Sequence, residues 1–538
     1  MSLDAFAMNL IQRVNVADIL RRSARQHRHK PALVSGQESV TYAQLDADVD
    51  RVARALQARG VGRGDHVALM FRNSVDFFRV YFANARIGAV SVPLNPSLTL
   101  AEYTHILTKT RPRLLLAHGG LAEVAGRITG AHPGLPVVLV PGGGGEDAEA
   151  LQAESWAGFL DAGAADDGVA GSVDAFVEDR DPVQVIFTSG TTSAAKGAVA
   201  SHLAAVFAAT SVVAHQRLTE HDVCLAIFPN HHVAGLNNSV VPYLMVGATT
   251  VLRDGWNAAA VAEAIERHSV TMMISTGPML LELVDRHGGQ FDWSTLRLVI
   301  LGMASVPADR AAVVRKLCPD VELLLASGQT EFTGYEEAMR REDQATKADS
   351  WGNPTLFTDV GIMDDSGRLL PPREVGEIVY RGPQSMNAYL DEPEQTAASF
   401  EHGWFHSGDL GYLDEENTVY FVDRKKDMIK TGGENVASVE VAQAILKLDA
   451  VAECTVVGLP HERWTEAVTA FVKLREGPTL EEGDVIAHCR SELAPFKVPK
   501  RVLFVEEFPR TATHKIRNVE LRKAYADLYL AANGQQST

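Results

Sequence analysis

Cysteine is scarce in this chain and forms no motif. Four are present in 538 residues, and no two of them stand in a CxxC pair. That spacing excludes the usual zinc cluster and a disulfide framework. Unpaired thiols favour a reducing compartment, so we expect a cytoplasmic protein. The cysteines are Cys224, Cys318, Cys454 and Cys489.

Long apolar runs and surplus positive charge are also missing. No window approaches the roughly 18 apolar residues of a membrane helix, and the N-terminal segment, with its early Asp4, does not resemble a signal peptide. The 50 basic and 68 acidic residues give a net charge of -18, which opposes non-specific binding to nucleic acid or anionic membranes. We therefore expect neither nucleic-acid binding nor integral membrane association, and any anionic ligand needs a local site.

What is present is typical of a folded protein with more than one domain. Hydrophobic residues make up 46% and charged residues 22% of the chain, as in ordinary globular proteins. Single hydrophobic cores stop growing at roughly 250 to 300 residues. At 538 residues, two or more domains are therefore expected.

Strand-like and helical patterns alternate along the first part of the chain. A helix is predicted over residues 41–56 and strands over 67–71, 91–94, 113–117 and 137–140, which indicates an α/β fold with mainly parallel sheets. After the charged segment DRKKD, a compact pattern predicts helices over 439–447 and 482–493 and strands over 454–457, 468–474 and 501–505. We predict one domain over residues 1–425 and a smaller one over 426–538.

The segment TSGTTSAAKG, residues 188–197, follows an apolar strand over 183–187. Small residues let backbone N–H groups turn inward as an anion nest, while hydroxyls add donors and a lysine adds positive charge. It is not a Walker A loop, because Ala195 stands where glycine should precede the lysine and Gly197 where a Ser/Thr metal ligand should follow. A polyphosphate site is predicted, with a flexible surface turn as the alternative. Its residues are Thr188, Ser189, Gly190, Thr191, Thr192 and Lys196.

Further motifs follow in order along the chain. They are PNHHVAG (229–235), LGMASVP (301–307), SGQTE (327–331), GWFHSGDLG (403–411), DRKKDMIKTGGENV (423–436) and PRTATHKIR (509–517). Together with the phosphate loop they resemble the adenylate-forming superfamily of acyl-CoA synthetases, acid-activating peptide-synthetase domains and luciferases. The resemblance covers residues 24–522, nearly the whole chain.

The resemblance implies roles for residues of the first motifs. His232 would gate the acyl tunnel, Thr330 would contact the α-phosphate and Glu331 would hold magnesium. Gly302, Met303 and Ala304 would flank the acyl group and the adenine, and Ser327, Gly328 and Gln329 would belong to the nucleotide-binding site. Ser327 replaces the usual aromatic residue, which puts the stacking surface for adenine in doubt.

The later motifs imply a second set of roles. Asp409 and Arg424 would bind the ribose, and a carboxylate suits two vicinal hydroxyls because it can accept two hydrogen bonds. Lys426 would be the hinge pivot, the turn at Gly432 and Gly433 would line the pantetheine tunnel, and Lys515 would bridge the acyl carboxylate and the α-phosphate. The chain departs from the family pattern at Ser193, Ala195, Ser327 and His514.

The resemblance also implies a fold and an activity. The expected fold is a large N-terminal domain with mainly parallel sheets flanked by helices, a small β-barrel-like subdomain, and a small mobile C-terminal α+β domain. The expected activity is an ATP-dependent carboxylate–CoA ligase, with ATP, CoA and Mg²⁺ as cofactors and with Lys515, Thr330, Glu331 and His232 as catalytic residues.

The identity of the acid is less constrained. Residues 233–247, which follow His232, are apolar apart from two Asn and contain no Arg or Lys, whereas a dicarboxylate would need a cation near its distal charge. This favours a monocarboxylate with an aliphatic or aromatic body. Two alternatives stay open: loading of a carrier-protein pantetheine, and an acyl- or nucleotide-binding sensor that has lost turnover. A homodimer is also left open.

Overall fold

The computed structural model describes residues 4–142, 153–163, 173–188, 195–302, 306, 308–475, 477–510 and 516–529. The chain forms two compact units. The first comprises residues 1–360 with 380–405, and the second comprises 361–379 with 406–538. The boundary expected between residues 425 and 426 stays a prediction.

Within the described residues, the first unit contains an eight-stranded and a nine-stranded sheet. Strands β3 to β6 pair in parallel in one sheet, and β10 to β14 do so in the other. The first sheet has the order β19 (Ala388–Tyr389), β9 (Lys196–Ser201), β8 (Pro182–Thr188), β4 (Val90–Pro93), β3 (His66–Met70), β5 (Leu114–His118), β6 (Val137–Val140) and β7 (Glu154–Ser155). The second has the order β16 (Asn353–Pro354), β15 (Glu337–Ala338), β14 (Glu322–Ser327), β13 (Leu298–Gly302), β12 (Met272–Thr276), β10 (Val223–Ala226), β11 (Thr249–Leu252), β1 (Pro31–Ser35) and β2 (Glu38–Thr41).

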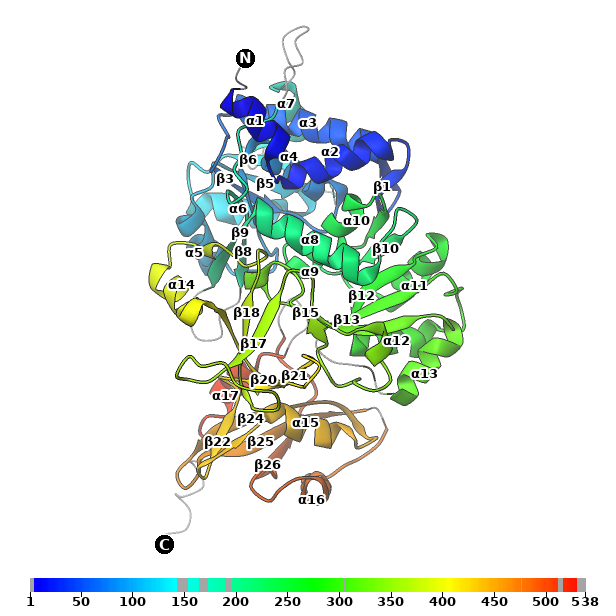
Figure 1. The fold of residues 1–538 in the computed structure, drawn as a ribbon, viewed down its shortest axis with the longest axis vertical. Helices are drawn as coiled ribbons and strands as arrows, with labels where there is room; N and C mark the ends of the chain where they lie inside the picture. The colour runs from blue at the N-terminus through cyan, green and yellow to red at the C-terminus, as the bar shows by residue number, and fades with distance from the viewer. Residues whose placement is uncertain are drawn as a thin grey trace. The chain divides into compact units, whose positions relative to one another are not determined.

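Helices fill the space between these sheets and cover their outer faces, giving five layers (Figure 1). The central layer shares one apolar core with both sheets and consists of α2 (Val16–Gln26), α3 (Tyr42–Ala58), α4 (Val75–Ile87), α8 (His202–Gln216), α9 (Val233–Ser239) and α10 (Val241–Met245). The outer layers are α5 (Leu100–Thr110) with α6 (Ala122–Ala131) and α11 (Ala258–Arg267) with α12 (Gly277–His287) and α13 (Ala308–Leu317). The expected α/β architecture is confirmed.

Local sequence explains why these elements begin and end where they do. Thr41 caps α3, since its hydroxyl accepts from the backbone N–H of Gln44 while the Gln44 side chain accepts from the N–H of Thr41. Gly60 follows the helix with a φ of +73°, a conformation that suits glycine. The helix predicted over residues 41–56 and the strands predicted nearby are observed, with boundaries within about two residues of the predicted ones.

The second unit carries most of a four-stranded sheet and all of a five-stranded one in the described residues. The four-stranded sheet has the order β17 (Asp359–Met363), β18 (Gly376–Arg381), β20 (Phe405–Leu413) and β21 (Val419–Arg424). The other contains β23 (Glu434–Val436), β22 (Ile429–Thr431), β25 (Thr465–Leu474), β24 (Val451–His461) and β26 (Arg501–Phe504).

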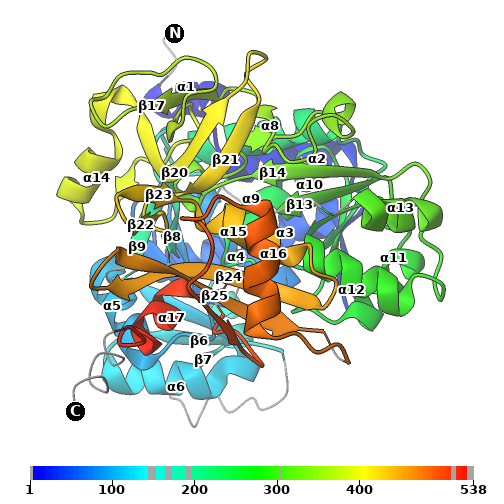
Figure 2. The same ribbon diagram turned by 90° about the horizontal axis from the view of Figure 1, so that it is seen from below.

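Successive side chains of β24 serve two different cores. Val456 packs with α15 (Ser438–Leu446) and α16 (Glu482–Glu492), whereas Val457 packs with α17 (Asn518–Ala524). Because strand side chains alternate between faces, helices cover both sides of this sheet (Figure 2). The C-terminal α+β pattern predicted from the sequence is observed.

The remaining elements are short. They are α1 (Ala5–Gln12), α7 (Trp156–Asp161), α14 (Pro393–Ser399) and the 3₁₀ turns η1 (Gly119–Leu121), η2 (Thr330–Phe332), η3 (Arg341–Asp343) and η4 (Glu401–Gly403). Among the described helices, none combines the length and apolar character needed to cross a membrane.

Candidate active site

Two of the predicted nucleotide-binding segments start where neighbouring parallel strands end. β13 ends at Gly302 and β14 at Ser327, and the strands are in register with Leu301 opposite Leu325. In open α/β sheets, ligands bind beyond the carboxyl ends of the strands. Gly302 and Ser327, where these strands end, therefore lie at the same edge of the sheet. Met303 and Ala304 lie outside the described residues.

The SGQTE segment forms a tight turn held by close backbone contacts. A Cβ at Gly328 would lie 2.1 Å from the carbonyl oxygen of Gly334, so only glycine fits there. Thr330 and Glu331 lie in the 3₁₀ turn η2, which Thr333 closes with a φ of +62°. This conformation is unusual for a β-branched residue and stores strain next to the predicted catalytic pair.

A buried carboxyl group accepts a hydrogen bond from the backbone of this turn. The backbone N–H of Gln329 donates to Oε1 of Glu336 at 2.9 Å, and Glu336 is fully buried. Burial, reinforced by the neighbouring Glu337, raises the pKa of Glu336 well above its ordinary value. Sequence reasoning missed this residue, although two adjacent glutamates between small and apolar residues in FTGYEEAM were a signal.

The phosphate loop joins the two strands of an antiparallel hairpin. Thr188 is the last residue of β8 and lies opposite Lys196, the first residue of β9. The hydroxyl of Thr188 donates to the carbonyl oxygen of Lys196 at 3.4 Å. A Cβ at Gly197 would lie 2.7 Å from Cγ1 of Val185, so the glycine after the lysine is required by packing across the hairpin. Ser189, Gly190, Thr191, Thr192 and Ser193 lie outside the described residues.

Tyr389 connects the phosphate-loop lysine with the predicted magnesium ligand. Its hydroxyl donates to Oε1 of Glu331 at 2.8 Å, and Nζ of Lys196 lies 4.9 Å from the centroid of its ring. Burial, together with the charge of Glu331, raises the pKa of Tyr389, which keeps the phenol a neutral donor. Backbone hydrogen bonds hold the segment around Tyr389 to both site residues' neighbourhoods. The Met386 N–H donates to the carbonyl oxygen of Glu331 at 2.7 Å, and the Leu390 N–H donates to the carbonyl oxygen of Gly197 at 2.8 Å.

Sequence reasoning missed Tyr389 and the charged residues that follow it. Lys109 forms an ion pair with Glu392, and this hydrogen bond, with a further contribution from Lys196, lowers the pKa of Glu392. The available signal was the polar segment NAYLDEPEQ after an apolar strand. The lysine side of the loop is thus surrounded by residues from three separate parts of the chain.

His232 begins helix α9, which contacts β10 and β12. It is the N-cap of α9, and its Nδ1 accepts from the backbone N–H of Ala234 at 3.3 Å. In this hydrogen bond Nδ1 carries no proton. The neighbouring His231 has its pKa lowered to about 4 by burial, so it is neutral at physiological pH. Both imidazoles are partly buried.

In the second unit, the two predicted ribose ligands lie opposite each other. Asp409 in β20 pairs with Arg424 in β21, and Nε of Arg424 lies 3.4 Å from Oδ1 of Asp409. Asp409 is buried. Lys426 follows β21, and its neighbour Lys425 forms ion pairs with Asp365 and Glu377 at 2.9 and 3.2 Å.

The predicted tunnel glycines form the tip of the β22–β23 hairpin. Gly432 and Gly433 have φ angles of +62° and +89°, and Thr431 lies opposite Glu434. Two consecutive positive φ angles are the mark of a type I′ turn, which glycine accommodates without strain. Gly432 N–H donates to the carbonyl of Trp464 at 2.9 Å. Lys515 and His514 lie outside the described residues.

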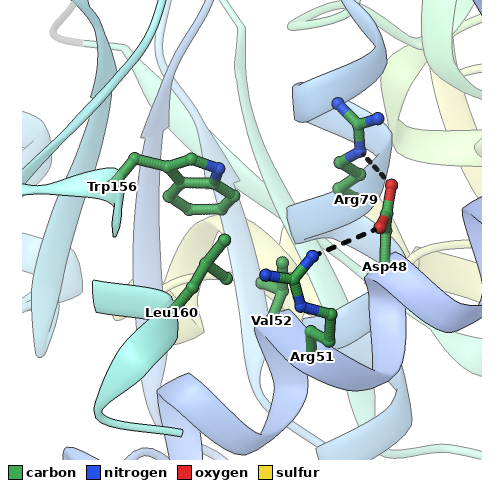
Figure 3. Close-up of a pocket in the computed structure, with 6 residues that line it drawn as sticks. All are labelled: Asp48, Arg51, Val52, Arg79, Trp156 and Leu160. Carbon is green, nitrogen blue, oxygen red and sulfur yellow. Dashed lines mark hydrogen bonds and ion pairs between the residues drawn. The ribbon is translucent and has the colours of Figure 1, made fainter. Parts of the chain in front are cut away.

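A pocket of about 210 Å³ lies elsewhere, between α3, α4 and α7 (Figure 3). Arg79 Nε lies 2.9 Å from a carboxylate oxygen of Asp48, and Arg51 lies 3.9 Å from the other. Its charged groups are therefore already paired, and none of the predicted site residues lines it. The lining residues are Asp48, Arg51, Val52, Arg79, Trp156 and Leu160.

Comparison with known proteins places this geometry in a family. The model of the AMP-binding enzyme family matches residues 20–390, and that of the AMP-binding enzyme C-terminal domain matches residues 440–515. The chain belongs to the AMP-binding enzyme family. The resemblance drawn from the sequence motifs is confirmed.

Relatives of this AMP-binding enzyme span nearly all of it. It is 34% identical to a feruloyl-CoA synthase of Amycolatopsis over 94% of this chain and 98% of the relative. It is 33% identical to an indoleacetate–CoA ligase of Aromatoleum aromaticum, over 92% and 95% of the two chains. It is 32% identical to a long-chain-fatty-acid–CoA ligase of Mycobacterium tuberculosis, over 95% and 99%.

Solved structures agree with these relatives. The AMP-binding enzyme superposes with a TM-score of 0.86 on ATP-bound MatB from Rhodopseudomonas palustris, at 27% identity over 96% of this chain and 100% of that one. It superposes equally well, with a TM-score of 0.86, on the anthranilate CoA ligase AuaEII in complex with anthranoyl-AMP, at 26% identity over 97% and 99%. This AMP-binding enzyme is therefore an ATP-dependent acid–CoA ligase, as the sequence predicted.

Proposed function

We propose that this enzyme activates a monocarboxylic acid with a ring-bearing or aliphatic apolar body. The proposal rests mainly on α9 and α10, the elements after His232, whose buried residues carry no cationic group that could meet a second carboxylate. The acids named for the relatives above, feruloyl, indoleacetate and long-chain fatty acids, support an apolar body.

In the first half-reaction, a carboxylate oxygen would attack the α-phosphorus of ATP. A new oxygen–phosphorus bond forms. The bond between the α-phosphorus and the oxygen that bridges it to the β-phosphorus breaks, and diphosphate leaves with the electron pair. Such steps depend on positioning and on cationic stabilisation of the transferring oxygens. Lys515 would bridge the carboxylate and the α-phosphate, Thr330 would donate to the α-phosphate, and Lys196 with the loop hydroxyls would hold the diphosphate.

Glu331 would hold a magnesium ion together with the phosphates. Magnesium is commonly bound through one or two carboxylates plus substrate phosphates and water. A single carboxylate fits that pattern, because the described residues contain no group of three or more side chains suited to a metal. The ion would neutralise phosphate charge, while the hydrogen bond from Tyr389 fixes the orientation of the Glu331 carboxylate.

In the second half-reaction, the thiol of CoA would attack the acyl carbonyl and AMP would leave. We assign Asp409 and Arg424 to the ribose, Lys426 to the hinge, and the Gly432–Gly433 turn to the pantetheine tunnel. Relatives that are CoA ligases align over 94% and 92% of this chain, which supports free CoA over a carrier protein and supports turnover over a sensor. A homodimer and a cytoplasmic location stay predictions.

The test is the exchange of labelled diphosphate into ATP over a panel of acids. We expect the fastest exchange with ring-bearing or fatty monocarboxylic acids, followed by a thioester when CoA is added. Fastest exchange with a dicarboxylic acid would refute the substrate class. Loss of exchange with every acid would refute the activity itself.

A further inference from the structure

A hydrogen bond ties helix α5 to the residue that precedes the phosphate-loop lysine. Nε2 of His105 lies 2.9 Å from the carbonyl oxygen of Ala195. Because a carbonyl oxygen can only accept, Nε2 carries the proton and donates it. The next residue is Lys196, the first residue of β9. The imidazole therefore holds the backbone at the point where the chain leaves the phosphate loop and enters the strand.

One turn further along α5, a second side chain reaches the segment around Tyr389. Residues four apart are neighbours on the surface of a helix, and Lys109 forms an ion pair with Glu392. The hydrogen bond and the charge of Lys109 lower the pKa of Glu392, with further contributions from Lys196 and His105. One helix thus holds both the backbone before Lys196 and the segment that carries the aromatic ring beside it.

The position of α5 is itself well determined. Thr99 and Glu102 form a capping box at the start of the helix. The buried side chains of α5 belong to the apolar core that also contains Val185 of β8 and Val199 of β9 (Figure 1). His105 therefore stands on an element that packs against the hairpin strands and does not depend on the loop for its place.

Ala195 is a residue whose backbone gains from an outside contact. The sequence from residue 189 to residue 195 is SGTTSAA, which contains no proline and no large side chain. An alanine leaves φ free where a proline would fix it at about −65°. Fixing a backbone costs conformational entropy. The hydrogen bond from His105 restrains Ala195 from an element that is already ordered.

We propose that His105 is a positioning residue for adenylation, which orients Lys196 toward the diphosphate by holding the carbonyl group of Ala195. The inference rests on the proposed role of Lys196 and adds a residue that lies outside every motif found in the sequence. His105 acts through Lys196 and does not touch the reacting atoms. It therefore matters for the step that handles diphosphate, and not for the transfer to CoA, in which diphosphate takes no part.

The test uses the full-length enzyme with ATP, magnesium, labelled diphosphate and the acid that gives the fastest exchange. Removing one hydrogen bond should lower kcat/KM for diphosphate in His105→Ala by roughly two- to tenfold. His105→Gln should restore most of that loss, because its amide nitrogen can also donate to the carbonyl oxygen. Thioester formation from a supplied acyl-adenylate and CoA should be unchanged in both variants.

Two further variants separate positioning from folding. Ala195→Pro fixes the φ that the hydrogen bond otherwise restrains, and no described residue accepts a backbone hydrogen bond from the Ala195 N–H. The loss caused by His105→Ala should therefore be smaller in the Ala195→Pro background than in the wild type. The matched control is His488→Ala, which removes a 3.0 Å hydrogen bond from Nε2 to the carbonyl oxygen of Ala444. It should lower the unfolding temperature and leave kcat/KM for diphosphate unchanged.

Three results would count against the inference. It is overturned if His105→Ala exchanges diphosphate as the wild type does. It is also overturned if His105→Ala slows exchange and thioester formation equally, or if its loss is the same with alanine and with proline at position 195, since both outcomes indicate a structural residue. Undiminished exchange in Lys196→Ala would instead overturn the proposed role of Lys196, on which the inference depends.

Discussion

At the scale of single residues, Tyr389 contacts two site residues through different parts of its side chain. The hydroxyl holds Glu331, and the face of the ring lies under the Lys196 ammonium group. Neutral hydrogen bonds and exposed cation–π contacts each contribute on the order of 1 kcal/mol. The two contributions can therefore be separated by substitution.

Tyr389→Phe keeps the ring and removes the hydroxyl. We expect a roughly two- to tenfold lower kcat/KM for adenylation, corresponding to about 0.5–1.5 kcal/mol, and a higher magnesium concentration at half-maximal rate. Tyr389→Leu should lose the contact with Lys196 as well and fall further. The measurement is diphosphate release as a function of magnesium concentration.

A matched control is Tyr243→Phe, which removes a buried hydrogen bond from the Tyr243 hydroxyl to Oε1 of Gln216, 2.8 Å long. It should lower stability without changing the magnesium dependence. An unchanged magnesium dependence in Tyr389→Phe would contradict the positioning role of the Tyr389 hydroxyl.

Sequence motifs singled out Lys196, Glu331 and Asp409, which lie at the start of β9, in the turn η2 and in β20, but could not predict Tyr389 or Glu336. A motif joins residues that are close together in the sequence, whereas Tyr389 donates a hydrogen bond to Glu331, 58 positions away. The buried state of Glu336 depends on the packing of β14 against β15.

At the scale of elements, the β22–β23 hairpin depends on its two glycines. A leucine at Gly433, with a φ of +89°, would be strained by roughly 1–2 kcal/mol, and its side chain would project into space where no atom lies within 4 Å of a Cβ. If this turn lines the pantetheine tunnel, Gly433→Leu should abolish thioester formation while diphosphate exchange continues.

The control for strain is Gly36→Leu. Gly36 also has a positive φ, of +60°, and no atom within 4 Å of a Cβ, but it lies between β1 and β2. It should reduce stability and leave thioester formation intact. Thioester formation at the wild-type rate in Gly433→Leu would remove the case for the tunnel.

Helix and strand positions were predicted well where the pattern was local. The helix expected over 482–493 is α16, Glu482–Glu492, and the strand expected over 137–140 is β6. The long pair β24–β25 was predicted too short, since Pro460 and charged residues such as Glu453 interrupt the apolar pattern while the strands still pair. The sheet order, with β1 beside β11, joins distant segments and could not be predicted from local pattern.

At the scale of the whole molecule, one chain would carry out two different chemical steps. Adenylation needs cations around the phosphates, whereas thioester formation needs a path for a thiol. Lys515, in the motif PRTATHKIR of the small C-terminal domain, is assigned to the first step alone. Lys196 and Glu331 belong to the other unit, so adenylation would use residues of both units.

The most direct measurement compares the two half-reactions in Lys515→Ala. Loss of one preorganised charge-stabilising group costs about 10²–10³ in rate, so acyl-adenylate formation should fall by that factor. Thioester formation from a supplied acyl-adenylate and CoA should stay within a few-fold of wild type. An equal loss in both half-reactions, or undiminished diphosphate release, would contradict the account.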